Sequence, residues 1–152
     1  MIPRFPLLAA SLAVACTVAC PAQDKGYWRA ASSTASSITG DISLSDSKIS
    51  IDFYIFPLVQ ARTLQPAEVS AAFDADVNAG RTGLLYRVTV PANKRFLHKN
   101  TLCGTEDTQW MATYVDGRTL QVAFFSGSQV PVFTVDALAG STDLCGTFTY
   151  GR

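Results

Sequence analysis

Residues 109–125 constrain the fold most strongly, because two β-rich runs flank Asp116-Gly117 in this segment. An Asp-Gly pair between such runs favours a two-residue type I′ turn, and therefore an antiparallel hairpin. A turn at these two residues pairs Val115 with Arg118 and Thr113 with Leu120. The sequence thus predicts antiparallel β-structure in its most regular segment.

Cross-strand partners share one face of a hairpin, so this pairing sorts the side chains into two groups. The group expected in the core consists of Met111, Val115, Leu120, Val122 and Phe124. The other face carries three aromatic residues, Trp110, Tyr114 and Phe125. Either a second layer of structure covers these aromatic residues, or they form a surface that binds a ligand or a partner.

The rest of the chain shows short alternating segments, such as Ile49, Ile51, Phe53 and Ile55, separated by turn residues. No long helical periodicity interrupts this pattern, and 152 residues suit one domain. We predict an all-β fold, a single antiparallel β-sandwich or small β-barrel of about eight to ten strands. Residues 38–152 are expected to form this domain, with residues 130–135 as one of its strands. Residues 23–37 are expected to form a flexible polar lead-in.

Residues 1–22 have the pattern of an export signal peptide, with Arg4 ahead of an apolar stretch at residues 7–19. That stretch is shorter than the ~20 residues that span a bilayer. Cleavage is expected before Gln23, or Cys20 becomes the lipidated first residue of a bacterial lipoprotein. A buried N-terminal helix is the remaining alternative. We therefore expect a protein of the bacterial periplasm or an outer-membrane lipoprotein, anchored to a membrane only through lipid at Cys20.

Two cysteines, Cys103 and Cys145, remain after either processing step, and each lies in a Leu-Cys-Gly-Thr sequence. An even number of cysteines in an exported chain predicts a disulfide. A reactive thiol pair is less favoured, because the chain has no Cys-x-x-Cys spacing.

The composition excludes several classes of function. Twelve basic residues balance twelve acidic ones, which gives no field that would attract nucleic acid. A single histidine, His98, leaves too few ligands for a zinc site. Residues 74–80 begin like a calcium loop, but Leu85 stands where the bidentate Glu belongs. We therefore expect no metal, no cofactor and no catalytic residues.

Basic residues are concentrated between residues 77 and 105, a stretch without any acidic residue. If residues 91–100 form a loop, it carries Lys94, Arg95 and Lys99 around Phe96. Such a loop is a candidate binding surface for an anionic partner or lipid surface. The alternative is that these charges are an ordinary solvated face.

Two short motifs resemble known families of small exported β-barrels. Residues 26–28, Gly-Tyr-Trp, are similar to the G-x-W motif of lipocalins, in which an Arg late in the chain lies across the Trp; Arg152 stands where such a residue would fall. Residues 82–86, Thr-Gly-Leu-Leu-Tyr, resemble the S-G-x-x-Y motif of bacterial inhibitors of c-type lysozyme. The second resemblance implies that Thr82 would reach into the cleft of a lysozyme.

These observations predict an exported, non-enzymatic binding protein. A small apolar ligand would require an interior cavity closed by Trp28. A protein partner would instead require a filled interior and an exposed patch near Trp110 and Tyr114, or near residues 96–99. The alternatives are an inhibitor of a secreted hydrolase and a hydrolytic enzyme that uses paired carboxylates.

Overall fold

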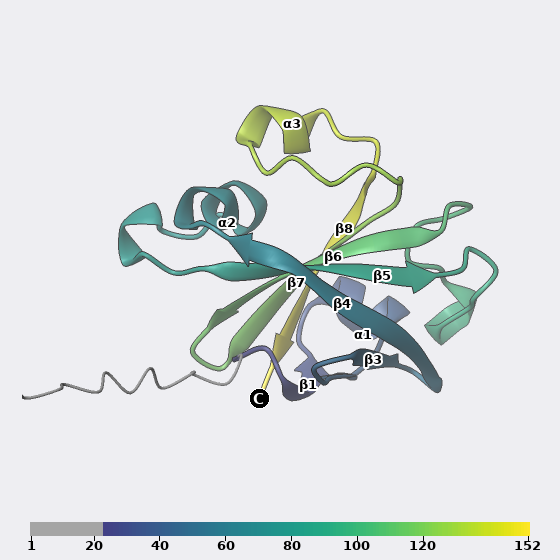
Figure 1. The fold of residues 1–152 in the computed structure, drawn as a ribbon. Helices are drawn as coiled ribbons and strands as arrows, with labels where there is room; N and C mark the ends of the chain where they lie inside the picture. Colours follow the sequence, from purple (N-terminus) through teal and green to yellow (C-terminus); the bar gives the residue numbers. More distant parts are fainter. Residues whose placement is uncertain (1–22) are drawn as a thin grey trace, which may run out of the picture.

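The computed structural model describes residues 23–152, and within this range the chain forms a closed eight-stranded antiparallel β-barrel. The all-β prediction is confirmed. The strands follow one another around the barrel in sequence order (Figure 1). They are β1 Gly26–Ala30, β2 Ile42–Leu44, β3 Lys48–Ile51, β4 Tyr54–Leu64, β5 Gly83–Val90, β6 Thr108–Asp116, β7 Thr119–Phe125 and β8 Leu144–Gly151.

The connections between strands differ greatly in length. Short turns join β2 to β3 and β3 to β4, whereas the β4–β5 connection contains helix α2, Pro66–Phe73, and the 3₁₀ turn η1, Val77–Ala79. The β7–β8 connection contains α3, Val135–Ala139. Figure 1 shows α2 and α3 next to each other on the outside of the barrel. No helix within residues 23–152 is both long enough and apolar enough to cross a membrane.

Local sequence places α2 against the barrel. Pro66 stands in its first turn, where a missing N–H costs nothing. Glu68 accepts a hydrogen bond from the N–H of Gln65 at 2.9 Å, and Asp74 ends the helix in a left-handed conformation. Val69 and Phe73 are thereby turned inward and buried.

The predicted flexible lead-in at residues 23–37 is wrong. Residues of this segment form β1 and the helix α1, Ser33–Ile38. This helix begins directly after Ser32, because the Ser32 hydroxyl accepts a hydrogen bond from the N–H of Ala35. Trp28 and Ala35 are fully buried. The polar composition of the segment concealed these two core residues.

The predicted strand at residues 130–135 is also wrong. Its valines, Val130, Val132 and Val135, are exposed, and Thr134 caps α3 instead. Pro131 lacks the N–H that a ladder requires.

The β6–β7 hairpin forms, but its register differs from the prediction by two residues. Asp116 pairs with Thr119 and Thr113 with Val122, so Gly117 and Arg118 make the turn. Gly117 takes the positive φ of +59° that this turn requires. A slip of two residues leaves every side chain on its predicted face, because the strand period is two.

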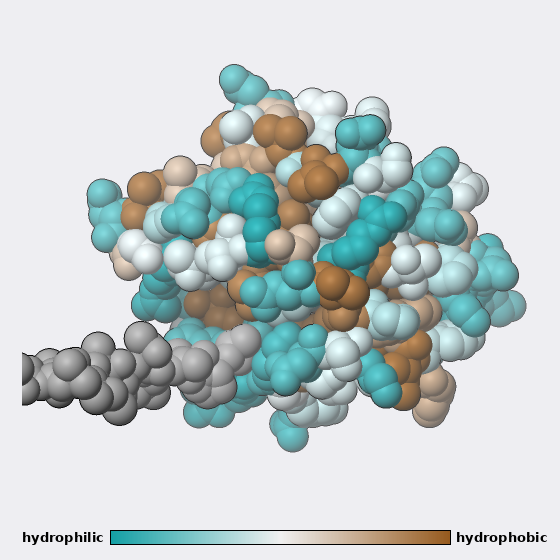
Figure 2. Space-filling model, in the orientation of Figure 1, coloured by the Kyte–Doolittle hydropathy of each residue, from teal (hydrophilic) through white to brown (hydrophobic). Residues whose placement is uncertain are grey.

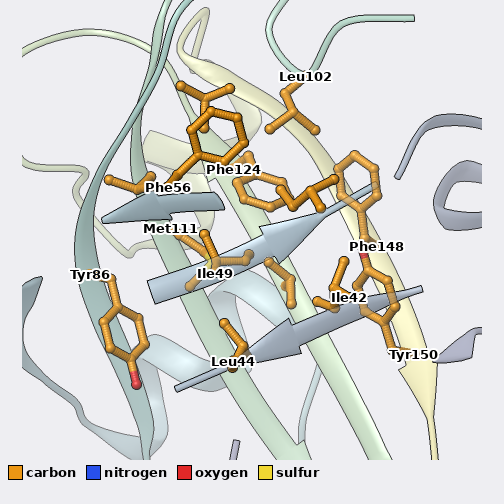
Figure 3. Packing of buried hydrophobic residues seen from close by; sticks show 14 of the residues in the cluster. Ile42, Leu44, Ile49, Phe56, Tyr86, Leu102, Met111, Phe124, Phe148 and Tyr150 are labelled. Carbon is orange, nitrogen blue, oxygen red and sulfur yellow. The ribbon is translucent and has the colours of Figure 1, made fainter. Parts of the chain in front are cut away.

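Side chains fill the barrel interior (Figure 3). Phe56, Phe124 and Phe148 come from three strands and belong to this interior cluster, and the rings of Phe124 and Phe148 pack edge to face at 5.2 Å. Trp28, Tyr86 and Tyr150 are also fully buried there. The predicted inner face of the hairpin is confirmed for Met111, Leu120, Val122 and Phe124, while Val115 is partly buried beside them.

A second apolar cluster lies outside the barrel wall. It contains Leu85, Trp110, Ala112, Tyr114, Ala123 and Phe125 from β5 to β7, with Val69 and Phe73 of α2 and Phe133 from the segment before α3. Tyr114 stacks on Phe73 at 5.9 Å, and Phe125 packs edge to face on Phe133 at 5.7 Å. Trp110, Tyr114 and Phe125 therefore lie under a second layer and do not form the open binding surface that was one of their two interpretations.

The disulfide Cys103–Cys145 is present, with sulfur atoms 2.03 Å apart. It connects the β5–β6 connection to the start of β8. The predicted pairing is confirmed.

Candidate functional site

The most exposed apolar side chains of the barrel wall lie on and beside β4. Phe53 is 96% exposed, Ile55 64% and Val59 65%, and the exposed Pro57 lies between the last two. We call Phe53, Ile55, Pro57 and Val59 the β4 stripe. Figure 2 shows this side of the molecule, with hydrophobic surface along the course of β4 and hydrophilic surface beside it.

The strand period explains why these residues point outward. Phe56 and Leu58 alternate with them and are buried inside the barrel. Ile51 pairs with Tyr54, so Asp52 and Phe53 form the turn between β3 and β4. Asp52 adopts a left-handed φ of 55°, which Asp tolerates better than most residues. Phe53 consequently stands at the tip of a hairpin.

Three cations flank the β4 stripe. Lys48 on β3 pairs with Pro57, and Arg87 on β5 pairs with Val59, so both side chains emerge on the outer face. Lys94 lies with its ammonium 4.8 Å from the centre of the Tyr54 ring, next to the hairpin tip. We call the stripe and these three cations the β4 face.

The Arg87 guanidinium is held in place by two neighbours on β6. It lies 4.8 Å from the Trp110 ring centre and donates a hydrogen bond to Gln109 at 2.9 Å. These two contacts fix the charge on the side of β5 that faces β6, one strand away from the stripe. The acid nearest in sequence to the stripe is Asp52, adjacent to Phe53.

Residues 91–100 form part of the β5–β6 connection, with the short turn η2 at Leu97–Lys99. Arg95 and Lys99 are exposed, and Lys94 is partly buried. The expectation that Phe96 belongs to this surface is wrong, because Phe96 is buried against Tyr54 and Phe56 at ring distances of 5.7 and 6.2 Å. An aromatic ring in a short cationic loop serves here as an anchor to the core.

A buried polar cluster lies near the start of the described chain. The Asp24 carboxylate is 2% exposed and accepts hydrogen bonds from the Tyr86 hydroxyl at 2.7 Å and the Thr113 hydroxyl at 2.9 Å. Lys25 donates to the Tyr86 hydroxyl at 2.9 Å. Burial, together with the bond to Asp24, raises the pKa of Tyr86 well above its usual value. Tyr86 therefore stays protonated and holds the carboxylate.

Sequence reasoning missed this cluster. Asp24, Tyr86 and Thr113 are far apart in the chain, and no local motif connects them. The cluster fastens residues 24 and 25 to the barrel, which is a structural role for a buried carboxylate.

Trp28 and Arg152 have the relation that the lipocalin resemblance implied. The Arg152 guanidinium lies 4.1 Å from the Trp28 ring centre. It also donates hydrogen bonds to the carbonyls of Lys25 at 3.0 Å and Gln23 at 3.1 Å. Arg152 therefore holds residues 23–25, which lead into β1, against the barrel.

The two ends of the motif that resembles lysozyme inhibitors lie in two environments, the protein surface and the barrel interior. Thr82 is exposed ahead of β5, whereas Tyr86 lies inside the barrel. Of this motif, Thr82 is exposed and Leu84 is partly buried, whereas the other three residues are buried.

Two clefts border α3. One has a volume of about 290 Å³ and the other about 310 Å³, and they share Phe125 and Leu138. The second is lined mainly by small and apolar residues, among them Ala71, Ala72, Ala123 and Leu144. Within residues 23–152, no three His, Cys, Asp or Glu side chains come together in a way that would hold a metal ion.

The fold and these surfaces define a class of architecture, a filled antiparallel β-barrel with one outer side covered by helices and the other bare. Comparison with protein-family models, curated proteins and solved structures found no match to this chain.

Proposed function

We propose that this chain is an exported, non-enzymatic binding protein that uses a filled barrel as a rigid scaffold and binds its partner through the β4 face. Large side chains occupy the barrel interior, which favours binding on the outside over binding in a central cavity. Most exposed apolar residues are scattered singly on protein surfaces, whereas the β4 stripe is continuous along one strand.

The observation that carries this proposal is Phe53. This phenyl ring at a hairpin tip is 96% exposed, so folding removes almost none of its apolar surface from water and the ring adds no hydrophobic stability. Its neighbours Ile55 and Val59 on the same outer face are also mostly exposed. Flanking cations at Lys48, Arg87 and Lys94 give the surface a definite charge preference.

Photo-crosslinking in the host cell tests the proposal. A photoreactive phenylalanine analogue replaces Phe53 in one variant and Val132 in another. Val132 is 63% exposed on the segment before α3, which makes it a matched control. We expect an adduct, to a protein or to a lipid, from position 53 and none from position 132. Equal yields from both positions, or no adduct from position 53, would contradict the proposal.

A second candidate function is binding of a small apolar ligand outside the barrel. The cleft of about 310 Å³ next to α3 is at the small end of ligand pockets, which begin near ~300 Å³. Native mass spectrometry of the protein purified from its host detects a retained ligand. Loss of that ligand in Ala71→Phe, at a partly buried residue of the cleft lining, with retention in Phe53→Ser, would support this candidate over the β4 face.

The same spectra test the proposed export. Residues 1–22 lie outside the described residues, so the covalent mass has to distinguish cleavage before Gln23 from lipidation at Cys20. The mass of the unprocessed chain would contradict both.

A further inference from the structure

We propose that the partner of the β4 face is the surface of an anionic lipid bilayer. This inference rests on the proposed function and names the partner class of the same site. It adds a peripheral membrane contact that is independent of any lipid attached at Cys20.

The shape of the β4 face favours a bilayer. The stripe lies on the outward side of a closed barrel, and both clefts described above lie elsewhere, next to α3. A protein partner would have to supply a groove to receive Phe53. The interfacial region of a bilayer adapts to a protruding ring and readily accepts aromatic and aliphatic side chains.

Residue order along the hairpin fits shallow insertion. Phe53 is at the tip and is the most exposed, and Ile55 and Val59 follow along the same outer face. These side chains would enter the boundary between headgroups and acyl chains, with the strands above them in water. The β4 backbone is paired with β3 over Tyr54–Pro57 and with β5 over Leu58–Leu64, which reduces the number of backbone groups that would enter the apolar region without a partner.

The charges give the preference for anionic headgroups. Lys48 and Arg87 lie on opposite sides of the stripe, and Lys94 is beside the tip. Each basic residue near an anionic surface raises the partition coefficient by about fivefold. Asp52, next to Phe53, acts in the opposite direction, so its removal should strengthen binding.

Vesicle co-sedimentation tests the inference. The chain carries Cys20→Ala, so that no attached acyl chain contributes. Vesicles of equal parts phosphatidylglycerol and phosphatidylcholine are compared with vesicles of phosphatidylcholine alone. We expect binding to the anionic vesicles that weakens as salt is added, and much weaker binding to the neutral ones.

Four variants sharpen this test. Phe53→Ser should lower the partition coefficient by about tenfold, through the lost apolar side chain. Lys48→Gln should lower it by about fivefold, and Asp52→Asn should raise it by about the same factor. Asn tolerates the left-handed conformation of Asp52, so the turn is preserved. Val132→Ser, on the segment before α3 and outside the β4 face, should leave binding unchanged.

The outcomes separate this inference from the proposed function. If the anionic vesicles do not bind, or if Phe53→Ser binds as well as the parent chain, the lipid inference is wrong. A discrete protein adduct at position 53 would in that case still uphold the β4 face as a binding surface. If vesicles fail and position 53 gives no adduct, both proposals are wrong. Melting temperatures of all variants confirm that each is folded.

Discussion

The outer wall of the barrel has two halves, one covered by other parts of the chain and one exposed. On the β5–β7 half, Leu85, Ala112 and Phe125 are covered by α2, α3 and the segment before α3. On the β3–β4 half, the outward residues Ile55 and Val59 remain exposed. Both halves follow the same period of two, and both put apolar side chains outside.

Connection length explains the difference. Residues 65–82 and 126–143 join β4 to β5 and β7 to β8, and both segments contain helices that fold back over the wall. The β2–β3 and β3–β4 connections are short turns, too short to fold back over the wall. Apolar residues under a covering layer have a packing role, whereas those without one call for another explanation. The following predictions test this comparison.

The largest expected effect is on the covered half. Trp110→Ala combined with Tyr114→Ala should destabilise the protein by at least about 5 kcal/mol, because each large-to-small change in a core costs about 3–5 kcal/mol. Trp110 is 8% and Tyr114 4% exposed. Urea unfolding of the double variant measures the loss, with Phe53→Ala as the control on the bare half. A loss below about 1 kcal/mol would show that this layer is not packed as core.

The disulfide should give the next largest effect, because it ties the connection that carries Lys94 to β8. Cys145→Ser should cost about 2–5 kcal/mol, mainly by freeing the unfolded chain. Thermal melting of the variant, and of the parent chain with reductant, should give the same lowered midpoint. An unchanged midpoint would mean that the bond contributes nothing to stability.

Sequence alone predicted the faces of the hairpin but not its register. The alternation of Met111, Val122 and Phe124 specifies a face under any shift of two residues, so the core assignment survived a wrong turn position. Phe96 was misplaced because a loop sequence does not reveal which aromatic ring turns inward.

Other features depended on contacts between distant segments. The Asp24 cluster joins residues that are 62 and 89 positions apart, and nothing local indicates such pairing. The β4 face was missed for a related reason. Ile55 and Val59 look like any alternating strand, and only the absence of a covering layer within the described chain distinguishes them.

A smaller effect should come from the ion pair that joins α2 to β4. Two hydrogen bonds of 2.9 and 2.7 Å run from Arg62 to Glu68 and lower the pKa of that carboxyl. A carboxyl whose pKa is lower in the folded state stabilises the protein at pH values above its unfolded-state pKa. This stability is lost as the pH falls through the folded-state pKa. Because Arg62 is partly exposed, Glu68→Gln should cost only about 0.5–1 kcal/mol at neutral pH.

The pH dependence provides the check on that ion pair. The difference between Glu68→Gln and the parent chain should shrink as the pH falls through the lowered folded-state pKa of the Glu68 carboxyl, and it should disappear once that carboxyl is protonated in both states. Urea unfolding at neutral and acidic pH measures it. A difference that persists in acid would assign the effect to helix capping by the side chain rather than to its charge.

The smallest effect is expected on the bare half. Ile55→Thr and Val59→Thr keep the β-branched shape that suits a strand and remove exposed apolar surface. Because these side chains are mostly exposed, each change should alter the free energy of unfolding by less than about 0.5 kcal/mol. Urea unfolding at two protein concentrations measures this. A loss above about 2 kcal/mol that depends on concentration would mean that a second copy of the chain covers the stripe, and the bare half would then be an interface between copies.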